Sequence, residues 1–349
     1  MIQRQLKLKL NCKQQVQLEE WLWSLTGVWN WSIRKIELDA KDGFFYRKQK
    51  FQNLLAGHSQ KIGIPSHTLQ GVLCTAFDAW DRCFKKRGGK PKLKGARRPL
   101  NSIPFPDPFK SPKGRWITVP GLGETRFHKQ DIPEGKIKCG RIVKRASGFY
   151  LCLFIDAQCA EIPKTGDSAI GIDPGFHTLL TLSTGEKVEH PKEFARAQER
   201  LAQAQRGKRK KQAARIHEKI SNQRKDRNHK LSRRLISQNQ VIVFSGDNHR
   251  AVAKKFGKSV SSAGHGQLRN MLSYKSLIGG RQYIEVNPKN STRICNVCKA
   301  LTGPTGLAGL SVRHWVCSGC GATHDRDVNA AINTLRAGVG ATLEIRFAA

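Results

Sequence analysis

The sequence predicts a multidomain α+β protein in which an antiparallel β unit with a helical insert precedes an α/β unit that carries a four-cysteine metal module. Three observations lead to this fold class. The 349 residues exceed what one hydrophobic core usually holds. The pattern changes from helical periodicity to short β-like runs near residue 100, and to alternating strands and helices after Ser168. Two Cys-x-x-Cys pairs stand near the C-terminus.

The charge of the chain indicates a polyanionic partner. Lys and Arg number 62 against 26 Asp and Glu, which gives a formal net charge of +36. Such an excess would destabilise an enzyme of small neutral substrates by self-repulsion, whereas a nucleic acid would neutralise it. The hydrophobic content of 38%, with seven Trp and 15 Phe, excludes a fully disordered chain.

Nothing in the sequence predicts membrane insertion or export. No apolar run approaches the ~18 residues of a spanning helix, and the first residues, MIQRQLKLKLNC, lack the apolar core of a signal peptide. We therefore expect no membrane partner and a cytoplasmic location, where the ten cysteines would stay reduced.

The first 85 residues predict one strand and at least two helices. Residues 2–10 alternate polar and apolar side chains, as a strand with a basic face does. Apolar residues then recur at intervals of three and four, which predicts an amphipathic helix. They are Leu18, Leu22, Leu25, Trp29, Ile33 and Ile36. A second helix is expected over 66–84, before a basic loop broken by glycine and proline.

Four tryptophans crowd into the first of these helices. Aromatic residues at helical spacing usually pack in a core, so the plainer interpretation is helix packing. The alternative is that one or two of them face outward and stack on bases. The four are Trp21, Trp23, Trp29 and Trp31.

Two different kinds of β structure follow. Residues 100–165 predict a small antiparallel unit, because proline is frequent and short β-like runs appear, and the N-terminal strand is expected to complete it. From Ser168 the sequence changes to a buried strand, a tight turn and a second strand. Further strands are expected at 240–246 and 281–287, with helical sequence between them. Alternating strands and helices predict an α/β unit.

The helical region at 192–238 is almost entirely positive in its second half. Like charges on one helix repel each other, and phosphates of a nucleic acid would relieve that repulsion. A solvated face is the alternative. We expect nucleic-acid binding by Arg209, Lys210, Lys211, Arg215, Arg224, Lys230, Arg233 and Arg234.

The two cysteine pairs predict a zinc site. Cys295 and Cys298 form one pair, Cys317 and Cys320 form the other, and eighteen residues separate them. Each turn offers two thiolates on one edge of a tetrahedron, and two turns close it. Four thiolates leave no open coordination position, so we expect one structural Zn²⁺. The alternative is four unrelated buried cysteines.

Three aspartates stand where a metal site could form. Asp173 ends a buried strand and begins the turn DPG, while Asp325 and Asp327 stand at the start of a helix. Each also has a structural interpretation, because Asp is common in turns and as a helix cap. Two or three converging carboxylates in a basic protein would hold Mg²⁺ against phosphates and cleave phosphodiesters by a two-metal route.

Five motifs in order along the chain carry a resemblance to a known family. They are GIDPG at 171–175, RKDRNHKLSRRL at 224–235, VNPKNSTRICNVC at 286–298, CSGC at 317–320 and DRDVNAAIN at 325–333. With WNWSIRK and IPSHTLQGVLCTAFDAW in the N-terminal half, the chain resembles TnpB over nearly its whole length. TnpB is the RNA-guided DNA nuclease encoded by insertion sequences and related to type V CRISPR effectors.

The resemblance implies architecture, partners and cofactors. It implies a guide RNA from its own element, double-stranded target DNA with an adjacent motif, one structural Zn²⁺ and two catalytic Mg²⁺. The location would be the prokaryotic cytoplasm, in association with the nucleoid. The implied domains are a β-barrel-like (wedge) domain at 1–10 and 86–165, a helical recognition domain at 11–85, an RNase H-like (RuvC) nuclease domain at 166–290 and 323–349, and a zinc-ribbon insert at 291–322.

The sequence departs from the family at one catalytic position. The family's second catalytic carboxylate is a Glu at the end of a strand similar to IVVEDL, whereas the strand here is VIVFSGDN and Ser245 takes that place. Serine lacks the charge of a carboxylate ligand. Either the nuclease is inactive, or a carboxylate reaches in from elsewhere, with Asp247 and Glu285 as candidates.

Of these two we expect Glu285, which belongs to the neighbouring strand ~4.8 Å away. The alternative interpretation of Glu285 is that it is an exposed strand residue paired with Lys or Arg. The resemblance implies Asp327 as the third ligand and leaves Asp325 as a cap. The predicted catalytic residues are therefore Asp173, Glu285 and Asp327.

Three functions are weighed on these grounds. The first is a Mg²⁺-dependent, RNA-guided DNA endonuclease of a transposable element. The second is an RNA-guided DNA-binding protein without cleavage, which would repress transcription. The third is a zinc-ribbon protein that binds RNA or the ribosome, in which Asp173 and Asp327 would be dispensable.

Overall fold

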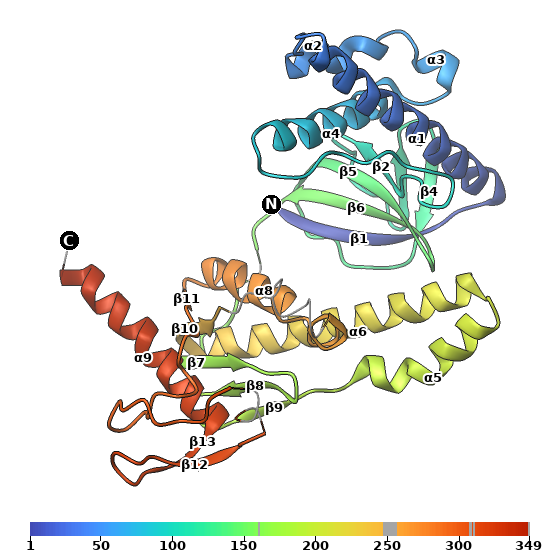
Figure 1. The fold of residues 1–349 in the computed structure, drawn as a ribbon. Helices are drawn as coiled ribbons and strands as arrows, with labels where there is room; N and C mark the ends of the chain where they lie inside the picture. The colour runs from blue at the N-terminus through green and yellow to red at the C-terminus, as the bar shows by residue number, and fades with distance from the viewer. Residues whose placement is uncertain (160, 247–256, 307–308, 310, 348–349) are drawn as a thin grey trace. The chain divides into compact units, whose positions relative to one another are not determined.

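The structure is a computed structural model that describes the chain except for residues 160, 247–256, 307–308, 310 and 348–349 (Figure 1). It divides into two compact units, Met1–Cys159 and Ala160–Ala349. Both units mix helices with strands, which confirms the predicted α+β composition. None of the described helices combines the length and the apolar character that crossing a bilayer requires.

A six-stranded antiparallel sheet forms the base of the first unit. Its strands are β1 (Ile2–Lys9), β2 (Ser102–Phe105), β3 (Trp116–Val119), β4 (Gly123–Phe127), β5 (Lys136–Arg145) and β6 (Gly148–Asp156), in the order β2-β5-β6-β1-β4-β3. The N-terminal strand lies inside the sheet, where Leu6 pairs with Leu151 and Leu8 pairs with Phe127. The prediction that it completes the β unit is confirmed. β2 and β3 end this order, so the pairings by themselves close no barrel.

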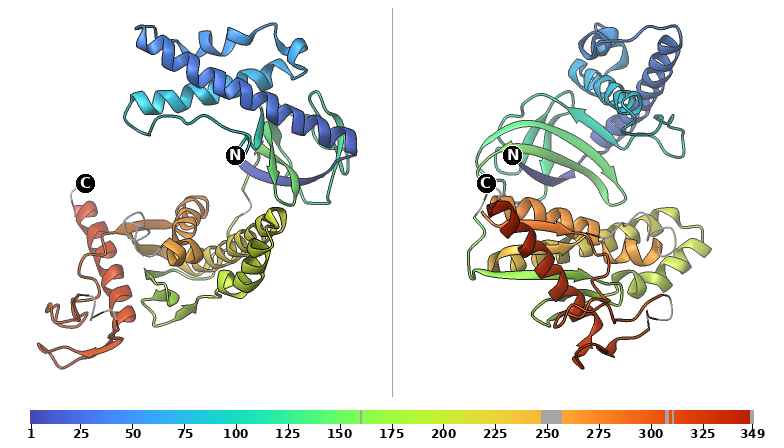
Figure 2. Two further views of the ribbon diagram at one scale, coloured as in Figure 1. Left: turned by 45° about the vertical axis from the view of Figure 1, so that its right-hand side comes forward. Right: turned by 60° about the vertical axis from the view of Figure 1, so that its left-hand side comes forward.

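Two long helices pack against each other and against this sheet (Figures 1 and 2). The first helix begins at a capping box, because Asn11 accepts a hydrogen bond from the Gln14 backbone and the Gln14 side chain accepts one from the Asn11 backbone. Apolar faces of both helices join the sheet in one core. The helical elements are α1 (Cys12–Lys41), α2 (Lys48–Gln52), the 3₁₀ turn η1 (Asn53–Leu55), α3 (Ser59–Ile62) and α4 (Ser66–Phe84).

The four tryptophans of α1 divide equally between the core and the surface. Trp21 and Trp29 are 4% and 8% exposed and pack in the core, whereas Trp23 and Trp31 are 62% and 40% exposed. The indole N–H of Trp29 also donates to the carbonyl of Lys92, which ties the basic loop after α4 to α1. Core packing, the plainer interpretation, therefore holds for Trp21 and Trp29. Trp23 and Trp31 face outward, as the alternative expected, and their stacking on bases remains a prediction.

A five-stranded mixed sheet organises the second unit. Its order is β11-β10-β7-β8-β9, in which β7, β8 and β9 are antiparallel neighbours while β10 runs parallel to β7 and β11 runs parallel to β10. The strands are β7 (Ser168–Pro174), β8 (Thr178–Leu182), β9 (Lys187–Glu189), β10 (Asn239–Ser245) and β11 (Gln282–Val286). All four strands expected from the sequence are present.

Different helices cover the two faces of this sheet. Ile172 and Phe244 share a core with Leu235 on the face that carries α6 and α8. On the other face α9 lies so close that a Cβ on Gly171 would stand 2.2 Å from the Ala331 carbonyl oxygen. The helices are α5 (Glu193–Arg206), α6 (Lys210–Gln238), α8 (His265–Ile278) and α9 (Arg326–Phe347), and a small hairpin joins β12 (His314–Val316) to β13 (Thr323–Asp325).

The basic region at 192–238 forms two helices rather than one. α5 and α6 pack side by side and meet at a tight turn, where Lys208 has a φ of 54° (Figure 1). Leu201 and Ile220 are among the few buried apolar residues that the two helices contribute. The turn brings the first basic residues of α6 to the end of a helical hairpin.

The contact between α9 and the sheet predicts a sharp stability effect at position 171. Gly171→Ala should lower the Tm of the protein by about 5 °C or more, because the added Cβ meets backbone atoms that cannot yield without moving α9. Gly27→Ala, in the middle of α1, is the matched control, since its Cβ would meet no atom within 4 Å and Ala favours a helix by about 1 kcal/mol. Equal Tm values for the two variants in calorimetry would contradict the packing described.

Candidate metal and carboxylate centre

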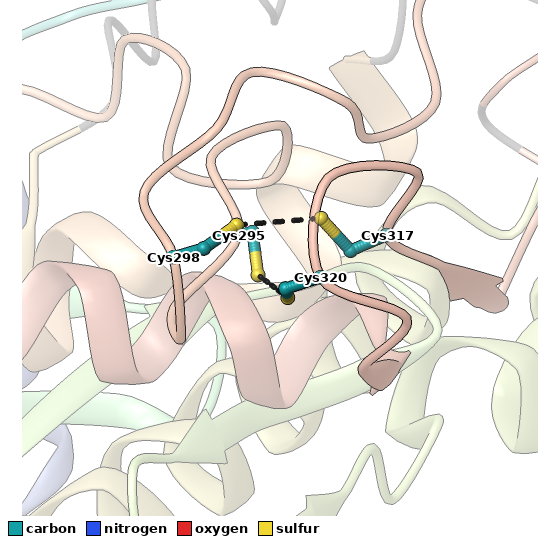
Figure 3. Close-up of side chains that lie close together, drawn as sticks. All are labelled: Cys295, Cys298, Cys317 and Cys320. Atoms are coloured by element: carbon teal, nitrogen blue, oxygen red, sulfur yellow. Dashed lines mark hydrogen bonds between the residues drawn. The ribbon is translucent and has the colours of Figure 1, made fainter.

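The four predicted cysteines gather into one cluster. Their sulfur atoms all lie within 4.8 Å of one another (Figure 3). The Cys295 and Cys320 sulfurs are 3.7 Å apart, and those of Cys298 and Cys317 are 3.5 Å apart. A tetrahedral zinc with Zn–S bonds of about 2.3 Å has S···S edges of about 3.8 Å. The cluster therefore fits a structural Zn²⁺ held by four thiolates.

Polar neighbours stabilise the thiolate form of Cys317. The Thr302 hydroxyl donates to the Cys317 sulfur at 3.1 Å. Together with the backbone N–H of Gly319, it lowers the pKa of Cys317 to about 6. The nearest atom to a Cβ on Gly319 would be the Ala300 Cβ, at 3.3 Å, which leaves little room for a side chain in this turn.

A buried histidine, which the sequence analysis missed, supports the cluster. His324 is 5% exposed, and its Nε2 lies 3.0 Å from the Cys295 sulfur. The ring packs on Trp315 with centroids 4.6 Å apart. Burial lowers the pKa of His324, so the neutral ring can donate its Nε2–H to the thiolate. Its position four residues after Cys320 was the only signal in the sequence.

Two asparagines of α9 fasten the first cysteine turn to the helix. The side-chain amides of Asn329 and Asn333 both donate to the carbonyls of Ser291 and Ile294, at 2.7–3.3 Å. The Asn329 carbonyl oxygen also accepts from the backbone N–H of Asn296 at 2.9 Å. The spacing of four residues places both amides on one side of the helix. The metal module and α9 are thereby joined.

Asp325 caps α9, as the sequence allowed. One of its carboxylate oxygens accepts hydrogen bonds from the backbone of Asp327 and Val328, both at 3.0 Å. The other lies 2.6 Å from the Lys187 ammonium. Burial raises the pKa of Asp325, but the bonds from Lys187 and the backbone outweigh it and lower the pKa overall. The interpretation of Asp325 as a cap is confirmed.

Asp173 and Asp327 belong to the same face of the second sheet. Gly171 faces α9, and Asp173 stands two residues further along β7, so its side chain points to the same face. Asp327 stands in the first turn of α9, one turn before Ala331, the residue that Gly171 contacts. A carboxylate oxygen of Asp327 also lies 3.4 Å from a guanidinium nitrogen of Arg313. The structure thus brings two of the three predicted catalytic residues to one face.

Ser245 belongs to that face too. Phe244 pairs with Ile172 across β10 and β7, so the next position on each strand places Ser245 beside Asp173. The serine is 1% exposed, and its hydroxyl is among the buried side-chain atoms without a hydrogen-bond partner in the described structure. A buried hydroxyl of this kind can donate one hydrogen bond to an oxygen at the site, but it carries no charge.

Glu285 lies on the opposite face, and the structure does not bring it to the two aspartates. It pairs with Phe244, and Val286 pairs with Ser245. Because side chains alternate along a strand, Glu285 points to the α8 face. There its carboxylate lies 3.0 Å from the Arg269 guanidinium. This geometry matches the ion-paired alternative to the expected metal ligand. Asp247, the other candidate, lies outside the described residues.

The eight predicted nucleic-acid-binding residues fall into two groups. Arg209, Lys210, Lys211 and Arg215 line one concave surface at the turn between α5 and α6. Three of the others have partners within the protein: Arg224 donates to the Ser261 carbonyl, Lys230 pairs with Asp226 and Arg234 pairs with Glu186. Arg233 is exposed. Because it gathers four of the eight residues on one surface, the turn is the stronger candidate for phosphate binding.

Comparisons with known proteins support the family that the sequence motifs indicate. A family model described as "Probable transposase" (OrfB, IS605) matches residues 155–246, and one described as "Cas12f1-like, TNB domain" matches residues 265–334. A "Putative RNA-guided DNA endonuclease" of Streptomyces pristinaespiralis is 33% identical over 298 residues, which cover 80% of this chain and 73% of that protein. The chain therefore belongs to the TnpB family.

Two further similarities extend this comparison. The "Putative RNA-guided DNA endonuclease InsQ" of Escherichia coli (strain K12) is 27% identical over 311 residues, covering 78% of this chain and 75% of that protein. A cryo-EM structure of a Cas12f1–sgRNA–target DNA complex aligns with 96% of this chain and 99% of that one, at 16% identity and a TM-score of 0.39.

The cysteine cluster predicts one tightly bound zinc per chain. Elemental analysis of the purified protein should find it, and Cys317→Ser should lose it, because three thiolates hold the ion far less well than four. Cys12→Ser is the control, since that exposed cysteine lies outside the cluster. Protein without zinc, or Cys317→Ser with an undiminished zinc content, would contradict the prediction.

The contact of His324 with Cys295 predicts a graded effect. His324→Ala should keep the zinc but weaken its retention against a chelator by about 10- to 100-fold, as the loss of a ligand's hydrogen-bond partner does. A competition titration with a colorimetric chelator measures this directly. Retention equal to that of the unmodified protein would show that the ring only fills space.

Proposed function

We propose that the chain is an RNA-guided DNA endonuclease of a transposable element. The observation that carries the proposal is the shared face of Asp173 and Asp327 within a chain of the TnpB family. In this proposal the second unit is a nuclease domain of the RNase H kind, and its mixed sheet with β7 at the centre is consistent with that.

Asp173 and Asp327 would hold Mg²⁺ at the nuclease site. Mg²⁺ usually takes one or two carboxylates and completes its octahedron with water and substrate phosphates. When bound, the cation would supply charge stabilisation and a more acidic water for attack on a phosphodiester. Two carboxylates and a neutral hydroxyl from Ser245 suit one ion. The resemblance implies a second ion as well, but its site would lack one carboxylate ligand, because Ser245 stands where the family has a Glu.

The proposed partners are a guide RNA from the protein's own element and double-stranded DNA beside an adjacent motif. The net charge of +36 supports a polyanionic partner. The relatives in Streptomyces pristinaespiralis and Escherichia coli are named as RNA-guided DNA endonucleases, which favours RNA and DNA together. The concave basic surface at the α5–α6 turn offers exposed cations for phosphates of either strand.

One observation favours a second function, RNA-guided DNA binding without cleavage. Ser245 occupies the position beside Asp173, and Glu285 is paired with Arg269 on the opposite face. If one Mg²⁺ at two carboxylates does not suffice, the chain would occupy matched DNA and repress transcription there. Both functions share the guide RNA and the target and differ only in the chemical step.

Cleavage of a guide-matched plasmid by the purified ribonucleoprotein separates the two functions. Its guide is identified first by sequencing the RNA that copurifies with it. For an endonuclease, Asp173→Asn and Asp327→Asn should each slow Mg²⁺-dependent cleavage by about 100-fold or more, because a bound cation supplies several kcal/mol to the reaction. Ser245→Glu should speed it, since it restores a charged oxygen on the same face. Glu285→Gln, on the other face, is the matched control and should cut normally.

Each outcome has one meaning. Matched DNA that is bound but never cut, with cutting gained by Ser245→Glu, would replace the endonuclease by the guided binder. Loss of cleavage in Glu285→Gln would show that this carboxylate reaches the site after all. Full cleavage by Asp173→Asn and Asp327→Asn would contradict both aspartates as metal ligands.

The basic turn predicts a salt-dependent interaction with RNA. Replacing Arg209, Lys210, Lys211 and Arg215 together by Gln should weaken RNA binding and reduce the slope of log affinity against log salt by about 0.7 per lost phosphate contact. Replacing Lys230 and Arg234 by Gln, which lie outside this surface and pair with Asp226 and Glu186, should reduce the slope less per changed residue. An unchanged slope in filter-binding titrations would mean that the turn faces solvent in the complex.

A further inference from the structure

An exposed aromatic surface stands where α1 and α4 end, in the first unit. Phe44 and Phe45 follow α1, and Phe84 is the last residue of α4. Their side chains are 55%, 65% and 48% exposed. Large apolar groups rarely gather on a surface without a binding partner. We call Phe44, Phe45 and Phe84 the aromatic surface.

The rings of this surface are held in place by contacts among themselves and with the core. Phe45 meets Phe84 edge to face with centroids 5.9 Å apart. Phe84 stacks on the buried Trp80 with centroids 5.2 Å apart and an interplanar angle of 23°. Phe44 meets Tyr46 edge to face at 4.7 Å. These residues line a cavity of about 180 Å³. Apolar cavities of about 150 Å³ accept one benzene ring, so a planar ring fits here.

A strongly basic loop begins at the edge of the aromatic surface. Residues 85–98 carry eight Lys or Arg and no Asp or Glu. Among the described residues, only Lys85 and Lys90 of this loop form ion pairs, with Asp81 and Glu37. Asn30 of α1 holds the loop by two hydrogen bonds with Lys94, both at 2.8 Å. Cations without acidic partners therefore lie next to exposed rings.

We propose that the aromatic surface stacks unpaired bases of a single-stranded nucleic acid whose phosphates lie along residues 85–98. Single-strand sites combine a basic track for the backbone with aromatic side chains for the bases, and each stacked base contributes about 1–3 kcal/mol, or roughly 5- to 150-fold in affinity. The proposal rests on the proposed function for the presence of RNA and of opened DNA. It adds a binding site in the first unit, whereas the proposed catalytic residues belong to the second unit.

Charge complementarity selects this occupant over a second copy of the chain. A second copy of this chain carries the same net charge of +36 and would meet eight cations of the loop with repulsion. A duplex hides its bases in the stack, so the rings could reach only its ends. A single strand offers phosphates and free base faces together.

Photocrosslinking tests the site without a guide or cleavage. Strands of about 12 nucleotides, one of DNA and one of RNA, carry a single 5-iodouracil and are irradiated with the purified full-length protein. Mass spectrometry should place the crosslinks on peptides that contain Phe44, Phe45 or Phe84. The relative yields of the two strands show whether RNA or DNA is preferred.

Substitutions at Phe45 separate stacking from apolar contact. Phe45→Ala should weaken binding of the same strand about ten-fold and leave the salt slope unchanged, because no charge is removed. Phe45→Tyr, which keeps the ring, should bind as the unmodified protein does, and Phe45→Leu, which keeps apolar area without the ring, should resemble Phe45→Ala. Replacing Lys86 and Arg87 by Gln should instead reduce the slope.

Several results would overturn the proposal. They are crosslinks only outside the aromatic surface, Phe45→Leu binding as tightly as Phe45→Tyr, or Phe45→Ala turning a dimer into a monomer in sedimentation with oligonucleotide affinity unchanged. The last would assign the surface to a second copy of the chain. Crosslinks at Phe45 in a protein that yields no guide RNA and neither binds nor cuts matched DNA would overturn the proposed function and leave this inference standing.

Discussion

The close contact of α9 with the second sheet is the constraint on which the candidate site depends. Gly171 leaves no space between β7 and the Ala331 carbonyl, and a Cβ on Gly338 would stand 2.4 Å from the Val243 side chain. The helix is thereby fixed at two points on neighbouring strands. Because Asn329 of the same helix holds the first cysteine turn, the metal module and Asp327 are both attached to α9.

The alternation of side chains along a strand then decides which residues can act together. A carboxylate moved from β10 to β11 would share the face of Asp173 only at position 286, because Val286 is the residue that pairs with Ser245. Glu285 stands one residue earlier and meets Arg269 of α8 instead. Glu285 therefore does not share the face of Asp173 and Ser245.

The positive charge of the chain is organised rather than evenly spread. Many acidic residues are used in ion pairs with nearby Lys or Arg, such as Glu193 with Arg227. The loop at 85–98 and the turn at 207–211 contain no acidic residue at all. The loop follows the end of α4 and the turn follows the end of α5, so each group of cations is anchored by a helix. A polyanion that reaches either segment meets charge without competing carboxylates.

The sequence by itself determined the features that depend on local order: the strands and helices set by periodicity, the four-cysteine cluster set by Cys-x-x-Cys spacing, and the family set by motifs such as GIDPG. Only the tertiary structure decided what depends on register and packing. The break at Lys208, the support of Cys295 by His324 and the face to which Glu285 points are of this kind. A shift of one residue between two strands reverses the face of every side chain, and no local pattern fixes that pairing.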